Sequence, residues 1–387
     1  RKNFRARDAA CAGETPVNRS DCPLFSPREQ RQGKTAGQKE RYPGLGAFRI
    51  PAALLVIAIH TSPLASFSET ADFLLTRVAG RVAVPFFLMV TGFFLLPDAA
   101  EGGREHSGGQ GARKAHRRLF RSVAHLIGLY VLSMLLYLPL NLYAGQMKGL
   151  TAAGFFKMLF FDGTFYHLWY LPAAAEGICL VYLLSRRFSL RGCLIISALL
   201  YLVGLGGDSW YGLMARHSLT AQVYQGIFSV SSYTRNGVFL APLFLCLGWL
   251  MARVKWQKKI RKASGWLFLL TLALMACEAL LLRGAGWIRH DSMYLLLPLC
   301  MVFLFLRLLS CRREMGSPQT LAACRSLSLT IYLIHPWVIV LVRGAAGVLG
   351  LENIFVTQSL IHFLTVAAGS CLLAICISSA FQLHCCK

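Results

Sequence analysis

Acidic residues are scarce in this sequence. Its 387 residues include 17 Asp and Glu against 40 Lys and Arg, and charged residues of both signs make up only 15% of the chain. Most segments also lack a polar face recurring at the period of a helix or a strand, which a soluble domain of this length needs to meet water. These absences exclude a soluble globular protein.

Several motifs that carry chemistry are missing as well. The sequence has no CxxC pair, no HExxH, no GxSxG and no glycine-rich phosphate loop. Its 13 cysteines are scattered, mostly inside apolar stretches, without the Cys and His spacing of a zinc site. We therefore expect the cysteines to pack in the core, and we expect neither a bound metal nor a bound cofactor.

Long apolar runs are abundant instead. Hydrophobic residues make up 56% of the chain, its mean hydropathy is +0.53, and stretches of about 20 residues, the length that crosses a bilayer, recur along most of it. This pattern predicts an all-α, polytopic membrane helical bundle. Its ten expected spans lie near residues 45–62, 80–97, 119–142, 168–185, 191–205, 236–253, 264–283, 291–309, 325–346 and 359–381.

The charges of the connecting loops predict the orientation. Lys and Arg favour cytoplasmic loops, and here they concentrate in every second loop, while the alternating loops carry few positive charges and several acids. With ten spans, both termini of this multi-pass protein fall in the cytoplasm, and we expect the plasma membrane as its location. The basic loops are 98–118, 185–191, 252–262 and 310–325; the alternating loops are 63–79, 143–167, 206–235, 284–290 and 347–358.

The net charge of +23 requires no nucleic acid. Most of it lies in the cytoplasmic loops and the N-terminal tail, where topology and anionic lipid account for it. The expected partner is the lipid bilayer, although a basic cytoplasmic face also suits a phosphorylated donor such as an acyl-CoA. Residues 1–41 are polar, basic and aperiodic, which predicts a disordered tail followed by one transmembrane domain over 42–387.

The first span carries two ionisable residues. Arg49 and His60 lie eleven residues apart in FRIPAALLVIAIH, so on a helix they share one stripe and lie roughly 16 Å apart along the axis. They either mark the two ends of the span or act together at two depths.

Polar residues gather at the outer ends of other spans. Charged groups at membrane depth are costly and tend to face an internal cavity, so we predict a polar chamber open to the outside; for any single residue, interfacial anchoring is the alternative. We expect His60, Arg81, His167, Arg235 and Asp291 to line one cavity. The other candidates at this boundary are Arg77, Trp169, Asn236, Arg289 and His290.

His335 stands apart, because it falls near the middle of the ninth span. Pro336 follows it and frees backbone groups for other partners. His335 is either a buried structural histidine or a residue on the route between the two faces.

Several motifs resemble the acyltransferase-3 family of membrane proteins over roughly 42–380. They are the Arg-x10-His pattern at 49–60, RVAVPFFLMVTGFFL at 81–95, HLWYLP at 167–172, RNGVFLAPLFLCLGWL at 235–250 and SLSLTIYLIHPWVI at 326–339. More narrowly, IAIHTSPLASFSETADFLLTR, FDGTFYHLWYLP and HDSMYLLLP resemble the membrane domain of the vancomycin-resistance serine racemases. Three positions depart from the family pattern: Gly46 stands where Asp is usual, Pro51 enters the first helix, and Thr91 replaces a common Ser.

The resemblance implies two functions, and both stay open. The first is O-acyl transfer, in which a cytoplasmic acyl-CoA, acetyl-CoA by preference, donates to a hydroxyl of an extracytoplasmic small-molecule or glycan acceptor. Arg49 would engage the donor and His60 would be the general base, a role that suits a neutral imidazole.

The second implied function is L-serine transport. Arg81 or Arg235 would hold the carboxylate and Asp291 the ammonium group, with a separate serine racemase as a partner. These residues contain no racemase active site, so no racemase activity is expected of them.

Overall fold

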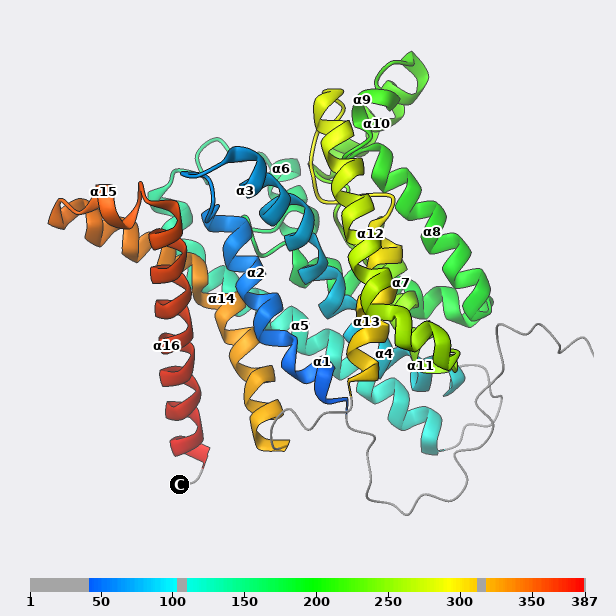
Figure 1. Ribbon diagram of the computed structural model, residues 1–387. Coiled ribbons are helices and arrows are strands. Elements are labelled where there is room, and N and C mark those ends of the chain that lie inside the picture. Colours follow the sequence, from blue (N-terminus) through cyan, green and yellow to red (C-terminus); the bar gives the residue numbers. More distant parts are fainter. Residues whose placement is uncertain (1–41, 103–109, 312–317, 386–387) are drawn as a thin grey trace, which may run out of the picture.

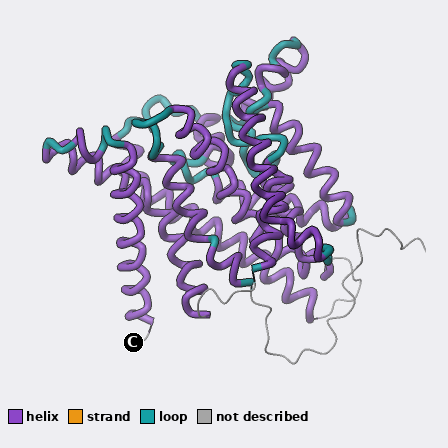
Figure 2. The backbone as a smooth tube through the Cα atoms, viewed as in Figure 1, coloured by secondary structure: helices purple, strands orange, loops and turns teal. Residues whose placement is uncertain are grey.

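The computed structural model describes residues 42–102, 110–311 and 318–385. Within these ranges the chain forms helices joined by loops (Figure 2). The tail expected to be disordered, 1–41, lies outside the described residues. The helices are α1 (Pro43–Ala47), α2 (Arg49–Thr61), α3 (Glu69–Phe73), η1 (Leu74–Val78), η2 (Ala79–Val82), α4 (Ala83–Gly102), α5 (Gln110–Tyr143), α6 (Ala152–Lys157), η3 (Met158–Asp162), α7 (Tyr170–Arg187), α8 (Leu190–Gly206), α9 (Tyr211–Met214), α10 (Ser218–Val230), α11 (Ala241–Arg253), α12 (Lys258–Gly284), α13 (Leu297–Ser310), α14 (Pro318–Leu349), α15 (Glu352–Phe355) and α16 (Ser359–Cys385).

Among the described residues, six helical stretches are long and apolar enough to cross a membrane: Pro43–Thr61, Glu69–Ala100, Arg113–Tyr143, Lys258–Gly284, Ala323–Leu349 and Ser359–Ala380. Three shorter apolar helices, α8, α11 and α13, lie among them. The all-α, polytopic membrane fold is thereby confirmed. The number of ten spans stays a prediction.

The helix α2 carries both ionisable residues of the first span. It begins at Arg49, and His60 is its last residue but one. Pro51 lies in the first turn, where its missing N–H costs no hydrogen bond within the helix. The helix ends because Ser62 adopts a left-handed conformation, φ 48°. Arg49 and His60 therefore belong to one uninterrupted helix, as their spacing predicts.

The second span begins earlier than predicted. Helical structure starts at Glu69, because the Ser68 hydroxyl accepts a hydrogen bond from the Ala71 amide and caps the helix. The expected start at residue 80 is therefore wrong, and Arg77 and Arg81 lie inside the helical stretch. The helix changes there from a π turn, η1, to a 3₁₀ turn, η2, and such irregular turns are frequent at functional sites.

The sixth and eighth spans begin later than predicted. α11 starts at Ala241 and α13 at Leu297, so Arg235 and Asp291 lie in non-helical backbone rather than at a helix start. Polar side chains satisfy the amides that a helix would otherwise pair: Glu278 accepts hydrogen bonds from the amides of Leu295 and Leu296, at 2.7 and 3.1 Å. Irregular backbone is tolerated at membrane depth only where protein surrounds it.

The core is built around α4, which packs most extensively against α11. Glycine permits the close approach on both sides. A Cβ atom at Gly92 of α4 would lie 2.1 Å from the Leu245 carbonyl oxygen, and one at Gly248 of α11 would lie 2.1 Å from the Met89 carbonyl oxygen. Small residues at helix contacts are typical of membrane bundles, where backbones approach closely.

The connecting elements gather at one end of the bundle. α3, α6, α9, α10 and α15 all lie at this end, and the C-terminal end of α16 lies at the other (Figure 1). These elements belong to the loops that the charge pattern assigns to the outside.

Candidate functional site

Three histidines from three parts of the chain meet at the end of α2. The ring of His60 stacks on that of His335, with centroids 5.4 Å apart, and His335 lies edge-on to His167 at 5.2 Å. The ring of Tyr166 lies 4.7 Å from that of His60. His167 and His335 are buried, and the side chain of His60 is half-buried.

The backbone fixes the tautomer of His335. Its Nδ1 lies 2.9 Å from the Tyr332 carbonyl oxygen and 3.2 Å from that of Ile331, so Nδ1 carries the proton and Nε2 holds the lone pair. Pro336 lacks the amide that would otherwise donate to Tyr332 in the helix. His335 therefore uses a backbone group that Pro336 frees, as expected.

Tyrosines hold the surrounding backbone. The Tyr137 hydroxyl donates to the carbonyl oxygen of Leu333, at 2.6 Å, and the Tyr332 hydroxyl donates to the carbonyl oxygen of His167, at 2.7 Å. By contrast, both ring nitrogens of His167 and Nε2 of His335 are buried and have no hydrogen-bond partner among the described residues. A buried polar atom without a partner costs about 1–3 kcal/mol, so these nitrogens favour a water molecule or a ligand group that could satisfy them.

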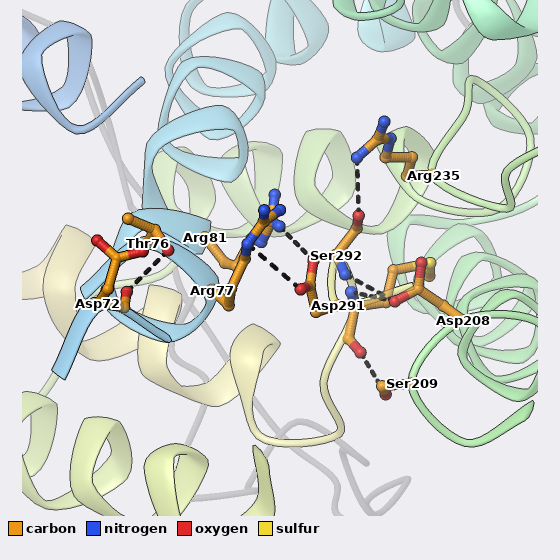
Figure 3. Close-up of polar contacts among 10 residues, drawn as sticks. Asp72, Thr76, Arg77, Arg81, Asp208, Ser209, Arg235, Asp291 and Ser292 are labelled. Carbon is orange, nitrogen blue, oxygen red and sulfur yellow. Dashed lines mark hydrogen bonds and ion pairs between the residues drawn. The ribbon is translucent and has the colours of Figure 1, made fainter. Parts of the chain in front are cut away.

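A second cluster centres on Asp291 (Figure 3). Its carboxylate pairs with the guanidinium of Arg81, and its other oxygen lies 3.5 Å from Nε of Arg77. Because Arg77 and Arg81 are four residues apart in η1 and η2, they reach the same carboxylate. Asp291 is thus already neutralised, which weakens the predicted role of Asp291 as the site for an ammonium group.

Asp208 holds the backbone that follows Asp291. One carboxylate oxygen accepts hydrogen bonds from the amides of Ser292, at 2.7 Å, and Met293, at 2.9 Å (Figure 3). The other oxygen has no partner among the described residues. Burial raises the pKa of Asp208 to about 7, although the two backbone hydrogen bonds oppose this shift. The role of Asp208 is to position Ser292.

Arg235 lies half-buried between aromatic rings. Its guanidinium carbon lies 4.2 Å from the ring centre of Tyr233 and 5.2 Å from that of Trp169, and its Nη1 donates to the Ser292 hydroxyl at 3.1 Å. Burial and the nearby charge of Arg81 lower the pKa of Arg235 to about 10, which leaves it charged at neutral pH. The ring of His290 packs at a tilt against that of Tyr233, with the two centroids 4.5 Å apart, and burial lowers the pKa of His290 to about 4.

Two predicted site residues, Asn236 and Arg49, belong to neither cluster. Asn236 uses its side chain locally, because its Oδ1 accepts hydrogen bonds from the amides of Val238 and Phe239, both at 3.0 Å. Asn236 thus caps the approach to α11. Arg49 is the first residue of α2 and therefore lies at the opposite end of this helix from His60 and the histidine cluster.

Two cavities adjoin the clusters. An inner cavity of about 20 Å³, room for one water molecule, is lined by Arg81, Trp169 and Ser292 among others. An outer pocket of about 300 Å³ is lined by Arg77, Asp291 and neighbouring residues. The five residues expected in one cavity are therefore divided: Arg81 lines the inner cavity and Asp291 the outer pocket, whereas His60 lies within electrostatic range of both Arg81 and Arg235.

Sequence reasoning missed three acids that matter to this region. Asp208 appeared only as an outer-loop charge, and Glu176 and Glu278 interrupt apolar stretches of α7 and α12. An acid inside an apolar run was the available signal, since such residues are rare and usually face the protein interior. No group of three His, Cys, Asp or Glu side chains in the described ranges has the geometry of a metal site.

Comparison with known proteins identifies the relatives of this chain. Residues 42–380 match the family model described as an acyltransferase domain. The chain is 40% identical over 337 residues to an amino-acid racemase of Enterococcus faecalis, covering 87% of this chain and 46% of the relative. It is 35% identical over 297 residues to a serine/alanine racemase of Enterococcus gallinarum, covering 76% of this chain and 40% of the relative. The chain spans less than half the length of these relatives, and no solved structure matches it.

Proposed function

Because the chain belongs to the acyltransferase-3 family of integral membrane proteins, we propose that it transfers an acyl group, acetyl by preference, from a cytoplasmic acyl-CoA to a hydroxyl of an extracytoplasmic acceptor. The membrane would be the plasma membrane. The observation that carries the proposal is α2, which has Arg49 at one end and His60, facing a buried cluster of imidazoles, at the other. One rigid helix thus links a group for the donor side to a base for the acceptor side.

In this mechanism His60 is the general base. Its imidazole takes the proton of the acceptor hydroxyl as the oxygen attacks the thioester carbonyl. A C–O bond forms, the C–S bond breaks, and coenzyme A leaves as a thiolate that takes up a proton. Arg81 and Arg235, whose charges reach His60, would stabilise the negative charge that develops on the carbonyl oxygen.

The other histidines would position the acceptor. The Nε2 atom of His335 and the ring nitrogens of His167 lie buried without a protein partner in the described part of the chain. A hydroxyl placed among them could donate to one nitrogen and accept from another. Trp169 lines the inner cavity and packs against Arg235, so it would bound this acceptor site.

Calorimetric titration of the purified chain with acetyl-CoA, combined with turnover assays, tests the proposal. Arg49→Ala should weaken acetyl-CoA binding about 10- to 100-fold, the value of a hydrogen bond to a charged group. His60→Ala should retain binding and lower turnover by about 10² to 10⁴, the usual contribution of a general base. His125→Ala, which removes an exposed histidine of α5, is the matched control and should change neither quantity. Absence of acetyl-CoA binding to the wild type would exclude acyl transfer by this chain.

Binding or transport of L-serine is the second candidate function. It is favoured by one observation, the similarity to a relative named serine/alanine racemase, and a separate serine racemase would be its partner. Arg81 or Arg235 would hold the serine carboxylate, and Arg235, which lies between the rings of Tyr233 and Trp169, is the one to test. Uptake of radiolabelled L-serine into proteoliposomes tests this function, and unchanged uptake in Arg235→Gln would count against that assignment.

A further inference from the structure

An ion pair connects the lining of the outer pocket to the lining of the inner cavity. Arg77 and Asp291 line the outer pocket, whereas Arg81 and Ser292 line the inner cavity. The two linings are close in sequence: Arg77 and Arg81 are about one helical turn apart, and Asp291 directly precedes Ser292. The ion pair between Arg81 and Asp291 joins the two linings.

The exposed fraction of these side chains falls from the outer pocket toward the inner cavity. The exposed fraction is 40% for Arg77, 22% for Asp291 and 9% for Arg81. Asp291 is therefore partly accessible to solvent in the outer pocket, whereas its partner Arg81 is buried. Ile59, the neighbour of His60 in α2, lines the inner cavity.

Arg77 and Arg81 together form a binding site for a carboxylate, and a carboxylate side chain already occupies it. Arginine recognises carboxylates through paired, charge-assisted hydrogen bonds, and the present occupant is the side chain of Asp291. A ligand carboxylate entering from the pocket has the same charge and geometry. Exchange of one carboxylate for the other keeps both arginines paired, while the displaced Asp291 can turn to the solvent it already contacts.

We propose that the outer pocket admits a ligand carboxylate that takes the place of Asp291 between Arg77 and Arg81, and that this exchange opens the outer pocket to the inner cavity. The acceptor of the proposed acyl transfer would then carry a carboxylate besides its hydroxyl. This point deepens the proposed function and rests on it. The gate itself requires no turnover.

Thiol labelling of the full chain in proteoliposomes tests the gate. Val84→Cys places a thiol in the inner cavity, and Ala65→Cys places one in the outer pocket. A membrane-impermeant methanethiosulfonate reagent is added, and modification at each position is read by peptide mass spectrometry, so the native cysteines stay in place. Propionate is the probe, and propionamide, of similar size but uncharged, is its control.

Propionate should accelerate labelling at residue 84 about tenfold, within the usual range of coupling between two sites, and should slow labelling at residue 65. Propionamide should do neither. Arg81→Gln/Asp291→Asn removes both charges together, so neither is left buried without a partner, and it should label rapidly at residue 84 without any probe. Labelling at residue 84 that is unaffected by propionate would overturn the proposal, whether or not acetyl-CoA binds.

Discussion

At the residue scale, several acids in the described part of the chain hold backbone or pair with arginine. Asp208 accepts hydrogen bonds from two amides of the segment before α13, and Glu278 accepts from two more. Asp291 is paired with Arg77 and Arg81. Each acid fixes the position of non-helical backbone beside the candidate site, so substitutions there act through geometry.

Asp208 provides a test of this role. Asp208→Asn keeps the acceptor oxygen and removes the buried charge, so its apparent melting temperature in detergent should not fall below that of the wild type. Asp208→Ala leaves the amides of Ser292 and Met293 without their acceptor, at a cost of about 1–3 kcal/mol for each buried group. A melting temperature equally low for both variants would show that the negative charge, rather than the acceptor oxygen, is what the fold needs.

The same residue predicts a pH dependence. Because the folded pKa of Asp208 is raised from 3.8 to about 7, the folded state keeps this proton where the unfolded chain has lost it. This contribution to stability is therefore fully present below about pH 4 and is lost as the pH rises to about 7. Asp208→Asn should lack this part of the pH profile in melting experiments at constant ionic strength, and an unchanged profile would contradict the raised pKa.

The sequence predicted that Arg49 and His60 share one helix, but it did not predict the tertiary partners of the polar residues. The spacing of Arg49 and His60 was sufficient to place both on one helix, because helical geometry alone decides it. The pairing of Arg81 with Asp291 depends on where α12, α13 and η2 meet. That is a tertiary relationship, and no local pattern encodes it.

At the element scale, hydropathy located the helices but misplaced several of their ends. Residues 293–296 continue the apolar run of α13 outward, yet Asp208 and Glu278 accept hydrogen bonds from three of their amides and from that of Ser292, which holds this stretch out of the helix. The opposite error occurred before residue 80, where the cap at Ser68 extends the helix outward. In both cases polar side chains, some distant in sequence, decide where the helix begins.

The contact between α4 and α11 gives an element-scale prediction. Gly92→Ala would put a methyl group 2.1 Å from the Leu245 carbonyl oxygen, so the two helices must separate, at a cost of about 1–3 kcal/mol or more. We expect a clear fall in apparent melting temperature and in the yield of folded protein by size-exclusion chromatography.

Gly128→Ala is the matched control for this contact. Gly128 lies inside α5, and a Cβ atom there would meet nothing within 4 Å. Replacing a helical glycine by alanine without a clash typically stabilises a protein by up to about 1 kcal/mol. Similar melting temperatures for Gly92→Ala and Gly128→Ala would mean that α4 and α11 do not pack as closely as the structure has them.

At the scale of the whole molecule, sidedness connects the fold to the proposed chemistry. The short elements α3, α6, α9, α10 and α15 share one end of the bundle (Figure 1), and the loops that contain them carry few Lys and Arg. The strongly basic loops alternate with them along the chain. A donor that enters among the basic loops and an acceptor that enters at the other end would meet inside the bundle, so the proposed reaction depends on this orientation.

Cysteine labelling of intact cells tests the orientation. Gln222→Cys, on the exposed side of α10, should react with an impermeant maleimide added outside, whereas Lys255→Cys, in the basic loop between α11 and α12, should react only after permeabilisation. Lys and Arg in short loops favour retention in the cytoplasm, which is the physical reason for the difference. The opposite pattern would place His60 and the outer pocket on the cytoplasmic side. Donor and acceptor would then have to exchange sides, and the roles proposed for Arg49 and His60 could not both hold.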